Sequence, residues 1–273
     1  MLSARFATPA HPSLTLPLPR AARRSTDKGS EEAVLAVVRS AFPGHAVLGE
    51  EGGVSGDVRS QLLWCVDPLD GTTNFAHSYP AFGVSVAVTR RGVPLAAAVV
   101  EFTGGPRAWG ERRYAAAAGR GATCNGARLA PSATSSLRRA LLVTGFGYDH
   151  GADWAANMGL FREFTHECQG VRRLGAASVD LCHVALGVLD GYWEFQLKPW
   201  DMAAGALVLT EAGGAVTKGD GSPFSVFAKS IVATNGPLHG ALLDKVCPAT
   251  HALREGGFDL NDWFIPEGYD AGK

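Results

Sequence analysis

The sequence predicts a layered α/β fold, and three observations support this prediction. The chain has 273 residues, of which 46% are hydrophobic, so it can bury a sizeable core. Its first half is a run of strand-like segments, whereas its second half alternates helical and strand-like segments. A run of strands followed by such an alternation favours stacked layers of helices and sheets over a simple doubly wound sheet.

The first half is predicted to begin with a helix and to continue as sheet. Residues 30–41 carry an apolar stripe at helical spacing; Ser30 is in position to cap this helix, and Pro43-Gly44 should end it. The glycine-rich residues 52–56 are predicted to form a loop, and Arg91-Gly92 to join two strands as a hairpin. The strands predicted here are 46–48, 62–66, 82–89, 93–102, 113–118, 128–129 and 141–144.

The second half is predicted to alternate between the two kinds of element. Apolar residues recur at helical spacing in one set of segments, and short apolar runs lie between them. The predicted helices are 153–167, 178–186, 202–212 and 237–246, and the predicted strands are 171–174, 191–195, 215–216 and 231–233. The chain has no internal repeat.

Charge, apolar patterning and cysteine content argue against a nucleic-acid-binding, membrane-spanning or disulfide-bonded protein. A formal net charge of −1 gives no electrostatic reason to expect a nucleic acid or an anionic membrane as a partner. No apolar run approaches the roughly 18 residues of a membrane span. The five cysteines (Cys65, Cys124, Cys168, Cys182 and Cys247) are odd in number and lack CxxC spacing, which predicts reduced thiols in a reducing compartment.

The first 25 residues differ in composition from the rest of the chain. They contain several arginines, they are rich in Ser, Thr, Pro and Ala, and no acidic residue precedes Asp27. This composition predicts an organelle transit peptide; a disordered leader is the alternative. Residues 26–273 would then form the functional domain.

The most informative stretch is residues 64–75, in which an apolar strand ends in Asp67, Pro68 turns the chain, and Asp70 follows. Two carboxylates this close repel each other unless a cation lies between them, and a hard ion such as Mg²⁺ or Mn²⁺ prefers oxygen ligands. Glu50 and Asp201 also lie between an extended segment and a turn or helix start. If the fold brings these four carboxylates together, they form a two-metal site suited to phosphate ester hydrolysis. Ordinary turn, capping and surface roles are the alternative for each residue.

The order of the motifs carries a family resemblance. Gly-Glu-Glu at 49–51, Asp-Pro-Leu-Asp-Gly-Thr-Thr-Asn-Phe at 67–75 and Trp-Asp-Met-Ala-Ala-Gly at 200–205 resemble the motifs of the inositol monophosphatase family of metal-dependent, lithium-sensitive phosphatases. Segments 146–148 and 182–187 resemble its plant chloroplast branch. The resemblance extends from residue 26 to residue 246 and implies the αβαβα sandwich of sugar phosphatases. It also implies bound Mg²⁺ (two or three ions, replaceable by Mn²⁺), a homodimer and a plastid location, with the cytoplasm as the alternative.

The resemblance further implies roles for individual residues. The side chains of Glu50, Asp67, Asp70 and Asp201 and the carbonyl of Leu69 would hold the metal. Glu50 and Thr73 would orient the attacking water, with Asp27 paired to Thr73. The substrate would contact Asp70, Gly71, Thr72, Thr73, Gly175, Ala176, Ala177, Glu194 and Asp201, and backbone N–H groups of residues 71–73 suit a phosphate.

The implied reaction is the hydrolysis of inositol monophosphate to myo-inositol and phosphate by a metal-activated water, without a phosphoenzyme. Histidinol phosphate or another sugar phosphate is an alternative substrate, because a few hydrogen bonds decide such specificity. Family members normally carry a pair of helices before the Thr-Asp position, and this chain reaches Asp27 almost without them. A truncated, non-catalytic metal-binding homologue of reduced stability is therefore the contrasting hypothesis. Nucleic-acid binding is disfavoured, because the basic residues cluster only in the leader.

Overall fold

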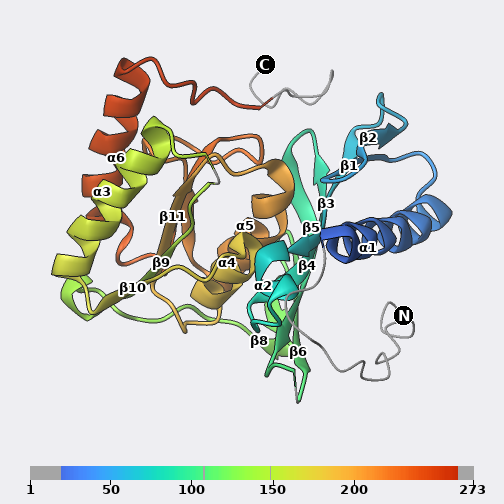
Figure 1. Cartoon of the computed structure of the whole chain (residues 1–273), viewed down its shortest axis with the longest axis horizontal. Helices are drawn as coiled ribbons and strands as arrows, with labels where there is room; N and C mark the ends of the chain where they lie inside the picture. The colour runs from blue at the N-terminus through green and yellow to red at the C-terminus, as the bar shows by residue number, and fades with distance from the viewer. Residues whose placement is uncertain (1–19, 107, 148, 264–273) are drawn as a thin grey trace.

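In a computed structural model of the chain, the structure describes residues 20–263 except 107 and 148, with side chains described from residue 26. Helices and sheets alternate in layers (Figure 1). Helix α1 (Arg20–Ala41) covers the outer face of the first sheet, α4 (Ala177–Ala185) and α5 (Pro199–Ala212) lie between the two sheets, and α3 (Ala152–Glu167) and α6 (His239–Glu255) cover the second sheet. This is the predicted αβαβα sandwich, so the predicted fold class is confirmed.

The first sheet has eight strands in the order β2-β1-β3-β4-β5-β6-β7-β8. Its strands are β1 (Ala46–Gly49), β2 (Gly53–Gly56), β3 (Leu62–Asp70), β4 (Phe82–Arg90), β5 (Val93–Thr103), β6 (Gly110–Ala117), β7 (Gly121–Cys124) and β8 (Ala127–Arg128). All neighbouring pairs are antiparallel except β1 and β3, which are parallel. This one parallel pair brings the carboxyl ends of two strands to the same edge of the sheet.

The second sheet has five strands in the order β10-β9-β11-β13-β12. Its strands are β9 (Leu141–Thr144), β10 (Gly170–Arg172), β11 (Gly191–Phe195), β12 (Ala215–Thr217) and β13 (Ser230–Thr234). β9, β10 and β11 are parallel, and β13 joins β11 and β12 in antiparallel pairing. A short helix, α2 (Thr72–Ala76), and a 3₁₀ turn at Leu137–Arg139 complete the described elements.

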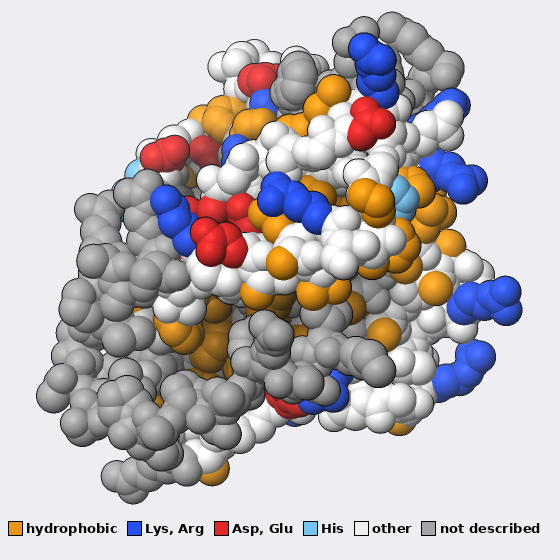
Figure 2. Space-filling model, turned by 90° about the vertical axis from the view of Figure 1, so that its right-hand side faces the viewer, with side chains coloured by type: hydrophobic (Ala, Val, Ile, Leu, Met, Phe, Trp, Pro, Cys, Tyr) orange, Lys and Arg blue, Asp and Glu red, His pale blue; other side chains and the backbone are white. Residues whose placement is uncertain are grey.

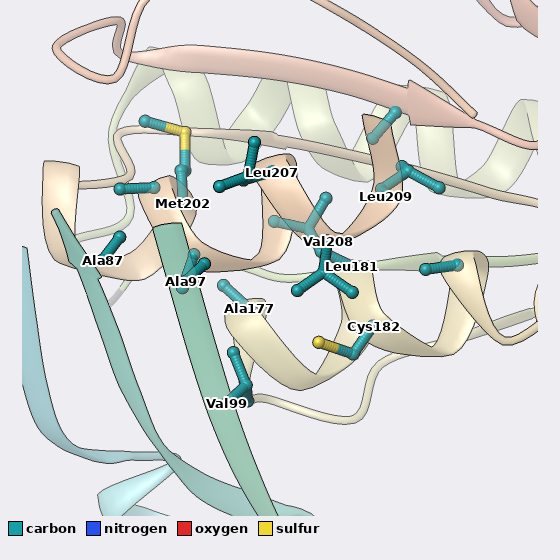
Figure 3. Packing of buried hydrophobic residues seen from close by; sticks show 14 of the residues in the cluster. Ala87, Ala97, Val99, Ala177, Leu181, Cys182, Met202, Leu207, Val208 and Leu209 are labelled. Carbon is teal, nitrogen blue, oxygen red and sulfur yellow. The ribbon is translucent and has the colours of Figure 1, made fainter. Parts of the chain in front are cut away.

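The main core lies where α4 and α5 pack between the sheets (Figure 3). Small side chains on β4 and β5, Ala87 and Ala97, face the large apolar side chains of α5. Helix α5 is apolar on nearly all sides, as expected for a helix buried between two layers. Gly205 permits the close approach of the two helices, because a Cβ atom there would lie 2.6 Å from the Cβ of Leu181.

The structure corrects the predicted start of the first helix. Helix α1 begins at Arg20, so Ser30 lies in its interior and does not cap it. Arginine and alanine are good helix formers, and they extend the helix backward from residue 30. Residues 1–19 of the predicted leader lie outside the described part of the chain, and residues 20–25 form the first turns of α1. The helix ends at Ala41, just before Pro43-Gly44, as predicted.

Two other element predictions differ from the structure. The predicted loop at 52–56 contains the edge strand β2, which pairs with β1 over four residues. The last helix does not end near Val246, because α6 continues through Pro248 to Glu255. Proline removes only one helical hydrogen bond, whereas burial of Leu242, Val246 and Leu253 along one side favours the continued helix.

On the face that carries α1, β1 and β2, hydrophobic side chains reach the surface between charged ones (Figure 2). The large exposed hydrophobic residues of these elements and the loops beside them are Val37, Phe42, Val54 and Val58. Within the described residues, no helix is both long enough and apolar enough to span a lipid bilayer.

Candidate active site

The parallel pairing of β1 and β3 positions the first two predicted ligands. Gly49, the last residue of β1, lies opposite Val66 in the register, so Glu50 lies beside Asp67. Asp67 is still inside β3, because this strand continues past the predicted end at Val66 to Asp70. The backbone N–H of Glu50 donates to the carbonyl of Val66, 3.2 Å away, which continues the ladder by one more step. The parallel pairing therefore places Glu50 and Asp67 next to each other, and both line the same cavity.

Contrary to the prediction, Pro68 does not end the strand but lies in an irregular part of β3 that the Asp67 side chain helps to hold. Asp67 Oδ1 accepts a hydrogen bond from the backbone N–H of Leu69 at 2.9 Å, and the pairing of β3 with β4 shifts register between Asp67 and Asp70. The Leu69 carbonyl accepts a hydrogen bond from Thr72 Oγ1 at 3.0 Å and retains a second lone pair for a cation.

Asp70 caps a helix that is distant in sequence. Its Oδ2 accepts hydrogen bonds from the backbone N–H (2.7 Å) and hydroxyl (2.6 Å) of Ser178, and its Oδ1 accepts one from the N–H of Ala177 (3.2 Å). These donors are at the N-terminus of α4, where the helix dipole favours a negative charge. A carboxylate has about four lone-pair positions, so these contacts leave room for a cation.

Asp201 stands at the third residue of α5 and not at its N-cap, which corrects the capping role considered above. Because Pro199 and Trp200 already belong to the helix, Lys198 is the capping residue. Asp201 Oδ2 accepts a hydrogen bond from the Lys198 backbone N–H at 2.7 Å. This contact fixes the carboxylate and leaves its other oxygen for a ligand.

These groups line one cavity with a volume of about 730 Å³. The predicted site residues in its wall are Glu50, Asp67, Leu69, Asp70, Gly71, Thr72, Gly175, Ala176, Ala177, Glu194 and Asp201. Asn74, in the helix that follows Gly71, links two segments near this wall, because its side-chain amide donates to the carbonyls of Ala81 and Leu174, each 2.6 Å away. Two predicted site residues, Asp27 and Thr73, are not in the wall of this cavity.

The carboxylates perturb one another. Burial raises the pKa of Asp67, Asp70 and Asp201 above the usual value, and neighbouring carboxylates raise the pKa of Asp67 and Asp201 further. Burial and the charges of nearby acids raise the pKa of Glu50, the most exposed of the four, to about 7. Such a group of hard oxygen donors fits a divalent cation, which would relieve the repulsion. Among the described residues, no three Asp, Glu, His or Cys side chains already stand in the arrangement of a metal site.

The second sheet contributes Glu194 to the cavity. This residue is buried in β11, where it accepts a hydrogen bond from the Tyr192 hydroxyl, and burial raises its pKa to about 7. Its carboxylate lies against Gly145, where any Cβ atom would overlap it. Gly145 is therefore needed to admit the Glu194 side chain into the wall.

Asp27 lies in α1 and is 9% exposed, with no hydrogen bond to its Oδ1. Its pKa is raised mainly by burial and to a smaller extent by the negative charge of Glu51. Its pairing with Thr73 remains a prediction.

The sequence motifs did not reveal several residues of the cavity wall. They include Arg173, Lys198, Lys229, Asp259 and Trp263. Lys198 could have been found from the sequence, since it precedes the Trp200-Asp201 motif by only two residues. Arg173 likewise lies only two residues before the predicted site residue Gly175. Lys229, Asp259 and Trp263 come from segments in which no motif was recognised.

Comparison with known proteins identifies the family and the fold. A model of the Inositol monophosphatase family matches residues 23–255. The chain belongs to the inositol monophosphatase family. This confirms the family predicted from the order of the motifs.

Relatives in this family include the chloroplastic phosphatase IMPL1 of Arabidopsis thaliana, which is 59% identical over 244 residues, covering 89% of this chain and 66% of that protein. An inositol-1-monophosphatase of Synechocystis is 43% identical over 79% of this chain and 73% of its own length. The structure of an inositol monophosphatase from Anabaena (Nostoc) superposes with a TM-score of 0.76 at 43% identity, covering 82% of this chain and 87% of that one.

Proposed function

We propose that this protein is a Mg²⁺-dependent phosphatase that hydrolyses inositol monophosphate to myo-inositol and phosphate. The observation that carries the proposal is that Glu50, Asp67, Asp70 and Asp201 line one cavity. Burial raises the pKa of each, and nearby acids raise the pKa of Glu50, Asp67 and Asp201 further. Membership of the inositol monophosphatase family supports the enzyme class.

The four carboxylates and the Leu69 carbonyl would hold Mg²⁺, or Mn²⁺ in its place. When bound, such ions neutralise the phosphate charge and lower the pKa of a water molecule. The protein's part is to orient the reactants. Glu50, and Thr73 with Asp27, would direct the attacking water toward phosphorus. A second water near Asp201 would give its proton to the leaving oxygen.

Substrate recognition would come from two sides of the cavity. Backbone N–H groups of residues 71–73 would bind the phosphate. Gly71 adopts φ 85°, and a Cβ there would lie 2.8 Å from the Ala81 carbonyl, so this turn needs glycine. Glu194 would accept hydrogen bonds from inositol hydroxyls, and the small residues Gly175, Ala176 and Ala177 would leave room for the ring.

Location and assembly are further parts of the proposal. The name of the chloroplastic relative from Arabidopsis supports a plastid location. A homodimer and sensitivity to lithium are expectations from the family.

The experiment is to measure phosphate release from inositol 1-phosphate with and without Mg²⁺, for the wild type and for Asp67→Asn. The proposal expects release that requires Mg²⁺ and is lost in the variant. A folded wild type that releases no phosphate from inositol 1-phosphate, histidinol phosphate or fructose bisphosphate would instead indicate a non-catalytic homologue. Release from histidinol phosphate alone would retain the phosphatase but change its substrate.

A further inference from the structure

The segment after the last helix returns to the active cavity. The match to the family model ends at residue 255, yet Phe258, Asp259 and Trp263 line the cavity. Between them, Leu260 is 7% exposed and belongs to the apolar core beside α6. Part of the cavity wall is therefore built by residues outside the matched region.

Several contacts fasten this segment to the rest of the fold. Asp259 forms an ion pair with Lys229, with 2.7 Å between Oδ2 and Nζ, and Asp262 forms one with Lys218, with 2.8 Å between Oδ1 and Nζ. The backbone N–H of Trp263 donates to a carbonyl in the loop before β13 at 2.8 Å. These contacts hold the segment in place without the indole N–H of Trp263.

The indole N–H of Trp263 is directed at the start of α5. It donates to the carbonyl of Leu197, 2.5 Å away. This carbonyl and the backbone N–H of Lys198 belong to one peptide unit, which is planar and rigid. The Lys198 N–H donates in turn to Asp201 Oδ2 at 2.7 Å. One peptide plane therefore connects the indole of Trp263 to the carboxylate of Asp201.

The ring of Trp263 also contacts the side chain of Lys198. The Nζ atom of Lys198 lies 3.0 Å from the ring centroid, and the negative face of an aromatic ring attracts a cation. Burial lowers the pKa of Lys198, and the negative charge of Asp201 acts in the opposite direction. Trp263 therefore contacts both the peptide unit and the charged side chain that act on Asp201.

We propose that Trp263 is a positioning residue for Asp201, because its indole N–H orients the Leu197–Lys198 peptide unit whose own N–H holds the Asp201 carboxylate. This inference rests on the proposed function, in which Asp201 is a metal ligand. Hydrogen bonds in a chain polarise one another, so the indole contact also strengthens the hydrogen bond to Asp201. A role limited to fastening the segment is already filled by the ion pairs, and it does not require a contact with this peptide unit.

The first measurement concerns the Lys198 amide in EDTA, without bound metal. In Trp263→Phe, which keeps an aromatic ring and removes the indole N–H, this amide should exchange its hydrogen about 10-fold faster, because support comparable to one hydrogen bond is lost. NMR of protein labelled with ¹⁵N-lysine gives the rate. Trp64→Phe is the matched control, since the indole of Trp64 donates to His45 Nδ1 at 3.0 Å, away from the cavity wall. It should leave the Lys198 amide unchanged.

The second measurement is the Kd for Mn²⁺, determined by isothermal titration calorimetry without substrate. Groups that orient a metal ligand contribute to metal affinity, so Trp263→Phe should raise this Kd about 3- to 10-fold. Asp262→Asn is the control for fastening, because it breaks an ion pair of the same segment and does not touch the peptide unit. Its Kd and its exchange at Lys198 should stay at the wild-type values. Melting temperatures show that each variant is folded.

Unchanged exchange at Lys198 in Trp263→Phe would overturn the proposal, whether or not metal binds. Faster exchange with an unchanged Kd would also overturn it, since the peptide unit would then not control the ligand. Equal effects of Asp262→Asn and Trp263→Phe, or loss of folding in Trp263→Phe, would leave only the fastening role. If the wild type binds no Mn²⁺, the proposed function has failed at its metal, and the exchange rate alone decides whether Trp263 positions Asp201.

Discussion

Glu31 Oε2 accepts a hydrogen bond of 2.9 Å from the backbone N–H of Glu51, the residue next to the proposed ligand Glu50. Glu31 is 4% exposed and lies in α1. Its neighbour Ser30 donates from Oγ to the Pro68 carbonyl at 2.8 Å, within the irregular part of β3 between Asp67 and Asp70. One helix therefore contacts both acidic loops and fixes their spacing.

Glu31→Ala is expected to destabilise the protein by about 1–3 kcal/mol, because the N–H of Glu51 loses its acceptor and a buried side chain is removed. The Mg²⁺ concentration needed for half-maximal stabilisation should also rise, since Glu50 is then held less firmly. Urea unfolding and a thermal-shift titration with Mg²⁺ measure the two effects. Exposed Glu32→Ala is the matched control. If Glu31→Ala has the stability and the Mg²⁺ response of the wild type, the hydrogen bond from Glu51 to Glu31 neither stabilises the protein nor positions Glu50.

Gly49→Ala should destabilise the protein by about 1–3 kcal/mol, because the new Cβ would lie 2.5 Å from Glu31 Oε2 and force the carboxylate away. The control is Gly29→Ala, at an exposed position inside α1 where no atom lies within 4 Å of the added Cβ. There alanine should stabilise the helix by about 0.5–1 kcal/mol. Chemical denaturation of both variants measures this difference in sign. If Gly49→Ala leaves the free energy of unfolding unchanged, the Glu31 side chain can move aside without destabilising the protein.

The parts of the site whose interacting residues are close together in the sequence could be predicted. Asp67 and Asp70 are three residues apart, so their repulsion and need for a cation can be read from the sequence. Asp70 and Ser178 are 108 positions apart, and the sequence contains no sign that one caps the helix of the other. Trp263 was not predictable for the same reason, since its contact with Lys198 depends on where the last helix ends. The interior position of Ser30 was missed because a serine before two glutamates is also a good helix start.

Asp180→Asn is expected to stabilise the protein at pH 8. Asp180 is 1% exposed, neither of its oxygens has a hydrogen-bond partner, and burial followed by the charge of Glu194 raises its pKa well above the usual value. Because its pKa is higher in the folded state, the Asp180 carboxyl group stabilises the fold fully at pH values below its unfolded-state pKa, near 3.8. This stabilisation is lost as the pH rises through the folded-state pKa. Asparagine stays neutral and avoids that loss.

Urea unfolding of Asp180→Asn and the wild type in EDTA, from pH 4 upward, measures this effect without bound metal. The two proteins should agree near pH 4 and diverge as pH rises. Equal or lower stability of the variant at pH 8 would mean that the ionised carboxylate finds a partner in solution.

Mg²⁺ should stabilise the protein more at pH 8 than at pH 5.5. Without metal, the pKa of Glu50 is raised to about 7 and those of Asp67 and Asp201 are also raised, so these groups contribute stability at low pH that is lost as pH rises through their folded values. A bound cation reverses the sign, because it favours the ionised forms and competes with protons. At a concentration 100 times the Kd, binding to the folded state alone adds about 2.7 kcal/mol. Melting temperatures with Mg²⁺ and with EDTA at both pH values give the comparison, and Asp67→Asn should lose most of the Mg²⁺ effect. A Mg²⁺ effect that is independent of pH, or that persists in Asp67→Asn, would place the cation away from these carboxylates.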